Sequence, residues 1–126
     1  MASPRILVVV DDEHARGLLV AVLRADGHAV DAAANRAEAL SAIDRHAYTV
    51  VLGALRMPGL DGPELVHALE ERHPLEMPAL IFLARPAFAP DLAHFLMESA
   101  AGLLEWPARP ADISRIVARS LAPTPA

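Results

Sequence analysis

Three consecutive acidic residues are the part of the chain best suited to chemistry. Asp11, Asp12 and Glu13 directly follow the predicted strand Arg5–Val10, which is apolar from Ile6 onward. Two adjacent carboxylates can hold a hard cation such as Mg²⁺ through oxygen ligands and water. Acidic side chains also stabilise the positive N-terminal end of a helix. Taken alone, the triplet fits this structural role better than a metal site.

Other reactive side chains give weaker signals. The six histidines form no pair at metal-ligand spacing beside a carboxylate cluster. His14 could reach the acidic pair, but we expect it to be an ordinary exposed helix residue. Arg56 and Arg85 could supply the positive partner that two neighbouring carboxylates need. The sequence has no cysteine, no glycine-rich phosphate loop and no nucleophile elbow.

The elements that must position these residues alternate along the chain. Short apolar runs are typical of buried strands, and apolar residues at helical spacing predict the segments between them as helices. Gly27 is suited to a left-handed helix end, Asn35 to an N-cap, and Pro63 to a first helical turn. The predicted strands are Arg5–Val10, His28–Ala33, Tyr48–Ala54, Leu80–Ala84 and Gly102–Glu105. The predicted helices are Glu13–Ala25, Arg36–His46, Pro63–Arg72, Asp91–Ser99 and Ala111–Leu121.

Five strands that alternate with five helices predict an α/β fold. The strands are expected to form a parallel sheet with helices on both faces. Right-handed crossovers between the strands then give a doubly wound fold. Sites in such folds lie beyond the carboxyl ends of the strands, near the switch in strand order. The residues expected there are Asp11, Asp12, Ala54–Met57, Ala84, Arg85, Trp106 and Pro107.

Bulk properties limit the class of protein. The 126 residues suit one domain, which we assign to 1–121, with 122–126 as a tail or the start of a linker. The net charge is −5 and the eleven Lys and Arg are scattered, so no basic stripe for nucleic acid is evident. No apolar stretch could cross a bilayer, and the start does not resemble a signal peptide. We expect a cytoplasmic domain.

Four segments, in order, resemble the receiver domains of two-component response regulators, the CheY-like superfamily. They are RILVVVDDE, VVLGALRMPGLDG, PALIFLA and SAAGLLEWP, and the loop Met57–Gly62 is the most specific of them. The resemblance extends over nearly the whole chain. It implies a flavodoxin-like doubly wound (βα)5 three-layer sandwich with a five-stranded parallel sheet, and a role in phosphorelay signal transduction.

The chain departs from that family where the phosphoryl group would bind. The phosphoacceptor Asp of the family lies three residues before the Met of the loop, and here that residue is Ala54. A hydroxyl residue normally ends the fourth strand, but Ala84 is found there, or Leu83 if the alignment slips by one. A Lys normally precedes the Pro after the fifth strand, but Trp106 precedes Pro107 here.

These substitutions predict a degenerate phosphorylation pocket. Phosphoryl transfer to a carboxylate needs a nucleophile, a bridging cation and donors for the phosphoryl oxygens. Ala54 offers no nucleophile. Of the family's Mg²⁺ site only Asp11, Asp12 and the backbone carbonyl of Arg56 remain, so we expect weak or absent metal binding and no other cofactor. The prediction is a pseudo-receiver, not an enzyme, that acts through protein–protein contact.

The resemblance also implies an interaction face. Receiver domains often contact a signalling partner, or a second copy, through the fourth helix, fifth strand and fifth helix. The matching residues here are Phe95, Leu103, Glu105, Ile113 and Ile116. Leu103 also occupies the place where many receivers have an aromatic switch residue. Burial of the apolar members in the core is the alternative.

Two other functions stay open at this stage. Asp11 or Asp12 could be a metal-dependent phosphoacceptor, or the altered pocket could bind a small ligand between Ala54, Ala84 and Trp106. We expect the Trp106 indole to pack over the two alanines, partly close the pocket and direct its N–H toward Asp11 or Asp12. The competing arrangement has Trp106 pointing outward as an anchor for a partner.

Overall fold

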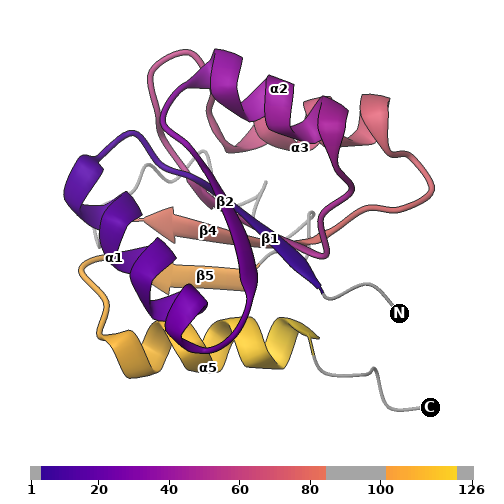
Figure 1. The fold of residues 1–126 in the computed structure, drawn as a ribbon. Coiled ribbons are helices and arrows are strands. Elements are labelled where there is room, and N and C mark those ends of the chain that lie inside the picture. The colour runs from indigo at the N-terminus through magenta and orange to yellow at the C-terminus, as the bar shows by residue number, and fades with distance from the viewer. Residues whose placement is uncertain (1–3, 85–101, 122–126) are drawn as a thin grey trace.

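A computed structural model describes residues 4–84 and 102–121 of the chain. All five predicted strands are present and form one sheet (Figure 1). The strands are β1 (Arg5–Val9), β2 (Ala29–Ala33), β3 (Val50–Ala54), β4 (Ala79–Ala84) and β5 (Gly102–Glu105). The described helices are α1 (Glu13–Ala25), α2 (Arg36–Arg45), α3 (Gly62–Arg72) and α5 (Pro110–Leu121). The helix predicted over Asp91–Ser99 lies outside the described residues, as do Arg85, Phe95 and the predicted tail.

The sheet is parallel throughout, with strand order β2-β1-β3-β4-β5. Helices α1 and α5 cover one face, and α2 and α3 cover the other (Figure 1). This arrangement confirms the predicted flavodoxin-like α/β fold.

The buried strands separate two apolar cores. Alternate residues of β1 point to opposite faces of the sheet. Ile6 and Val8 therefore join the core under α1 and α5, whereas Leu7 and Val9 join the core under α2 and α3. All four side chains are at most 2% exposed. The run of consecutive apolar residues in β1 follows from burial on both faces.

Local signals fix the helix ends. Asn35 caps α2 by accepting a hydrogen bond from the backbone of Glu38, as predicted, and Gly27 adopts a positive φ of 93° after α1. At α3 the cap is Asp61, which exchanges reciprocal hydrogen bonds with Glu64. Pro63 alone predicted the start of this helix, and the Asp-x-x-Glu spacing of the capping box is a second sequence signal that the prediction missed.

Several predicted ends differ from the structure by one or two residues. The third strand was expected from Tyr48 and begins at Val50. Tyr48 is nevertheless buried, and its hydroxyl donates a hydrogen bond of 2.8 Å to Asp31. Because Tyr48 is buried, it extends the apolar run in the sequence and resembles a strand residue. It nevertheless lies before the first paired residue of β3. Among residues 4–84 and 102–121, no helix is long and apolar enough to cross a membrane.

Candidate functional site

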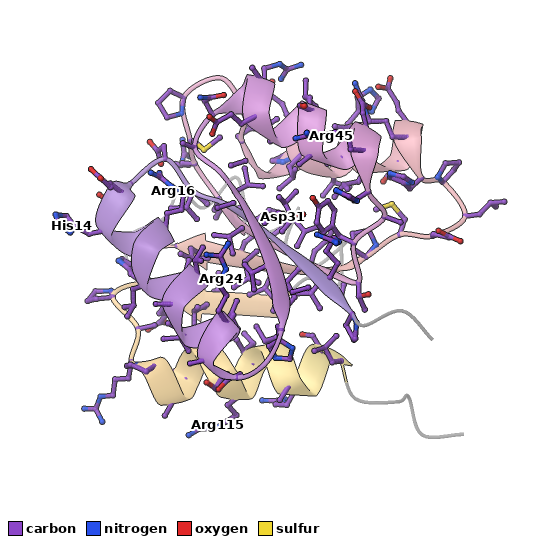
Figure 2. All side chains as sticks on the ribbon, viewed as in Figure 1. His14, Arg16, Arg24, Asp31, Arg45 and Arg115 are labelled. Atoms are coloured by element: carbon purple, nitrogen blue, oxygen red, sulfur yellow. The ribbon has the colours of Figure 1, made fainter. Side chains whose placement is uncertain are left out.

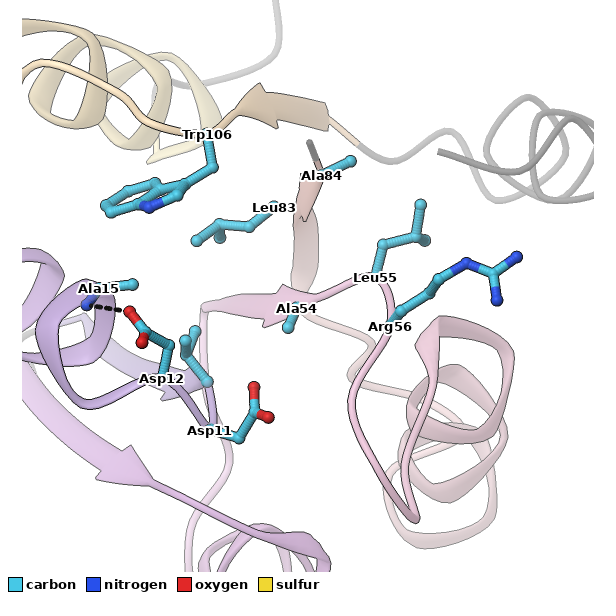
Figure 3. A pocket seen from close by; sticks show the side chains of 10 residues that line it. Asp11, Asp12, Ala15, Ala54, Leu55, Arg56, Leu83, Ala84 and Trp106 are labelled. Carbon is cyan, nitrogen blue, oxygen red and sulfur yellow. Dashed lines mark hydrogen bonds between the residues drawn. The ribbon is translucent and has the colours of Figure 1, made fainter. Parts of the chain in front are cut away.

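The strand order creates a pocket at the carboxyl edge of the sheet. The chain leaves β1 toward β2 on one side, whereas β3 lies on the other side of β1. The segments that follow β1 and β3 therefore diverge, as at other switch points in doubly wound folds. A pocket of about 280 Å³ lies there (Figure 3). Its described lining residues are Val10, Asp11, Asp12, Ala15, Ala54, Leu55, Arg56, Leu83, Ala84 and Trp106.

Asp12 has a structural role in this pocket. It is the N-cap of α1, and its Oδ2 accepts a hydrogen bond of 2.8 Å from the backbone N–H of Ala15. One turn into the helix, Arg16 donates from its Nη1 to the backbone carbonyls of Val10, at 3.0 Å, and Asp11, at 3.2 Å. The loop between β1 and α1 is thus held at both ends. Arg16 was not among the residues predicted at this site.

The Asp11 carboxylate is exposed and directed toward the pocket (Figure 3). Within the described part of the chain, no cationic side chain forms an ion pair with Asp11 or Asp12. Arg56 extends away from both carboxylates (Figure 3), so the suggested pairing is not formed. His14 points outward from α1, as expected of an exposed helix residue (Figure 2).

The register between β3 and β4 shows which residue of β4 lies next to Ala54, the residue predicted at the family's phosphoacceptor position. Ala54 pairs with Leu83, whereas Ala84 pairs with Glu105 on β5. Side chains alternate along a strand. Leu83 therefore lies beside Ala54, and Ala84 packs into the core under α2 and α3. Of the two residues that the sequence left open for the family's hydroxyl position, Leu83 is the one paired with Ala54.

Trp106 forms one wall of the pocket and does not close it. Its indole is partly buried against the core under α1 and α5, on the side of Ala15 and Leu83 (Figure 3). Leu83 projects between the indole and Ala54, which explains why the indole does not cover the alanine as expected. The indole N–H makes no hydrogen bond with Asp11, Asp12 or any other described residue. Pro107, joined to Trp106 by a cis peptide bond, is exposed.

The metal ligands of the pocket are incomplete. Mg²⁺ prefers near-octahedral coordination by oxygen. Asp11 is available, Asp12 already uses one oxygen as an N-cap, and Ala54 contributes none. No group of three or more His, Asp or Glu side chains in the described ranges could hold a metal ion. These residues do not match the donor set that the family resemblance implied.

The family model of the response regulator receiver domain matches residues 6–118. The chain belongs to this family. The likeness that the sequence segments suggested is therefore confirmed over most of the receiver domain.

Named relatives agree with this assignment. The chain is 34% identical over 93 residues to the transcriptional regulatory protein TcrA of Mycobacterium tuberculosis, covering 74% of this chain and 36% of TcrA. It is 32% identical over 113 residues to the DNA-binding transcriptional regulator NtrC of Escherichia coli, covering 90% of this chain and 23% of NtrC. The chain thus spans roughly a third of the length of TcrA and a quarter of the length of NtrC.

A solved structure supports the fold. The chemotaxis protein CheY4 of Vibrio cholerae superposes with a TM-score of 0.84, covering 95% of this chain and 100% of CheY4. Its sequence identity is 24%, so the likeness concerns the fold alone.

Only some residues of the expected interaction face are exposed to solvent. Leu103 is 38% exposed and Glu105 is also exposed, while Ile116 is partly buried. Ile113 is fully buried and belongs to the core under α1 and α5, so its assignment to the face was wrong. The helical spacing of α5 directs Ile113 and Val117 inward together.

Proposed function

We propose that this receiver domain is a pseudo-receiver, which works by protein–protein contact without aspartyl phosphorylation. The observation that carries the proposal is Ala54 at the end of β3, with Leu83 beside it in the register. A methyl group cannot attack phosphorus, and an isobutyl group cannot donate a hydrogen bond to a phosphoryl oxygen. Two of the groups that the reaction needs are therefore replaced by hydrocarbon.

The third substitution, Trp106 at the family's Lys position, removes a positive charge from the pocket. Charged phosphoryl oxygens require preorganised donors or cations in the pocket. Trp106 occupies the family's Lys position, and its indole lies against apolar neighbours. Asp11 and Asp12 add negative charge and form no ion pair within the described residues, which disfavours the approach of an anionic phosphodonor. The pocket supports neither the chemistry nor the binding of the phosphoryl group.

The partner of such a module would be a cytoplasmic signalling protein or a second copy of this chain. The exposed Leu103 and Glu105 on β5 support contact beside α5. An isolated apolar side chain is ordinary on protein surfaces, so this face is secondary to the pocket in the proposal.

Intact mass tests the loss of phosphorylation. The protein is incubated with acetyl phosphate and Mg²⁺, beside an intact receiver domain as the positive control. We expect the control to gain one phosphoryl group and this chain to gain none. A phosphoryl adduct would overturn the proposal.

Two variants locate any adduct that does form. Asp11→Asn removes the exposed carboxylate. Asp12→Asn removes the other and retains a good N-cap residue, so the fold of α1 is preserved. Loss of the adduct in either variant would identify that residue as an alternative phosphoacceptor.

A further inference from the structure

The pocket that no longer suits phosphate has the features of a small-molecule site. Seven of its ten described lining residues are apolar. Its volume of about 280 Å³ is near the lower end of small-molecule pockets, roughly 300–1,000 Å³. Trp106 provides an aromatic wall, and Leu83 and Ala54 provide an aliphatic floor (Figure 3).

The charges around the pocket select the sign of the ligand. The Asp11 carboxylate is directed into the pocket, and the Arg56 guanidinium extends away from it (Figure 3). The N-terminus of α1 would favour an anion, but Asp12 already caps it at 2.8 Å. The whole chain carries a net charge of −5, which adds a weak long-range attraction for cations.

We propose that this pocket binds a small organic cation, an ammonium group attached to an aromatic or branched aliphatic body. The ammonium group pairs with Asp11, and the apolar body packs on Leu83 and the Trp106 indole. An aromatic ring also attracts a nearby cation through its face. The proposal goes beyond phosphorylation independence, because it supplies this receiver domain with a different input at the same edge of the sheet.

Trp106 is the only tryptophan of the chain and lines the pocket, so its fluorescence should respond to a ligand that binds there. Phenethylamine is titrated into the protein while tryptophan emission is recorded. Phenethyl alcohol and phenylpropionate are the uncharged and anionic counterparts of similar shape. We expect a saturable change with phenethylamine at a dissociation constant of about 1 mM or tighter, a weaker effect with the alcohol, and none with the anion.

Three variants place the binding. Asp11→Asn should weaken phenethylamine roughly twofold to fivefold, the usual range for an exposed ion pair, and leave phenethyl alcohol unchanged. Ala54→Leu should fill the floor and abolish the response. Glu70→Gln removes an equal charge from the exposed side of α3 and should have no effect. Melting curves confirm that each variant is folded.

Several outcomes would overturn the proposal. One is the absence of a saturable response to phenethylamine. A second is equal affinity for the amine and the alcohol, which would show an apolar site without selection for a cation. A third is an unchanged response in a folded Ala54→Leu variant, which would place binding elsewhere. None of these outcomes depends on the mass measurement, so the pseudo-receiver assignment is tested separately.

Discussion

Ala54, Leu83 and Trp106 are neighbours in space although they lie far apart in the sequence. We propose that each stands where receiver domains carry an oxygen or a flexible cation, and all three line one pocket. Their effects on phosphoryl transfer should not be additive, because nucleophile, metal ligand and oxyanion donors act as a unit. Restoring one of them should therefore restore little.

Ala54→Asp alone should give little or no labelling by acetyl phosphate in Mg²⁺, because Leu83 and Trp106 still offer no donor. The triple variant Ala54→Asp, Leu83→Thr, Trp106→Lys should be labelled at least tenfold faster, since each restored group stabilises developing charge. Rates come from intact mass against time. Rapid stoichiometric labelling of the single variant would show that the last two positions matter little.

Trp106→Ala should destabilise the domain moderately. Truncating a fully buried Trp costs roughly 3–5 kcal/mol. The indole is only partly buried, against Ala15 and Leu83, so a loss of about 1–3 kcal/mol in the free energy of unfolding is expected. Urea unfolding measures it, with circular dichroism as the probe because the variant lacks tryptophan. An unchanged midpoint would favour Trp106 as an outward partner anchor.

Asp31 at the β2 edge of the sheet should make stability depend on pH (Figure 2). Burial raises the pKa of its carboxyl, but hydrogen bonds from Tyr48 and Arg5 outweigh that effect and hold the pKa below its usual value of 3.8. A lowered folded-state pKa gives stability that is complete above the unfolded pKa and lost as pH falls through the folded one.

Asp31→Asn should therefore lower stability at neutral pH, by on the order of 0.5 kcal/mol after solvent screening. The difference from the wild-type chain should shrink below about pH 4. Thermal melts across this range measure it. A difference that stays constant with pH would mean that the carboxylate charge is not the source of the stabilisation.

Elements were more predictable than the residues at their ends. The consecutive apolar run of β1 and the helical spacing of α1 indicated both segments within one residue. The side of the sheet to which a β4 residue points could not be predicted, because each of Leu80–Ala84 is apolar and a one-residue slip changes no pattern. In the structure, Leu83 is the β4 residue that pairs with Ala54 of β3.

The direction of the Trp106 side chain could not be predicted from the sequence either. The identity of the residue showed a loss of positive charge but gave no information on the space that Leu83 fills. Burial of Ile113 was predictable in principle. Its position four residues before Val117 in α5 places both on the inward face.

The contact of α3 with β3 gives a test of packing at the element scale. A Cβ added at Gly53 would lie 2.8 Å from Cδ2 of Leu65, so this side chain would have to move. Gly53→Ala should cost about 1 kcal/mol. Gly17→Ala is the matched control, because Gly17 is an exposed α1 residue with open space around its Cα and should gain about 0.5–1 kcal/mol.

Urea midpoints of the two glycine variants give opposite signs if this account of the packing is right. A neutral or stabilising Gly53→Ala would mean that Leu65 can adopt another rotamer at no cost, and that α3 does not require close approach to the sheet there.

At the scale of the whole molecule, the chain has the receiver fold, and the proposal concerns only the pocket at the carboxyl edge of its sheet. The family match over residues 6–118 and the superposition on CheY4 both agree with a receiver fold. The pocket shares residues with both cores, since Leu55 and Ala84 belong to one and Val10, Ala15 and Leu83 to the other.

We propose that phosphorylation does not set the state of this domain. Backbone amide spectra of the labelled protein, recorded before and after acetyl phosphate and Mg²⁺ are added together, test it most directly. The spectra report both covalent modification and any change of conformation. We predict that the resonances of β5, α5 and the pocket residues stay unchanged apart from small Mg²⁺-induced shifts at Asp11 and Asp12. A new set of resonances around Ala54, Leu83 and Leu103 that depends on the phosphodonor would contradict the account.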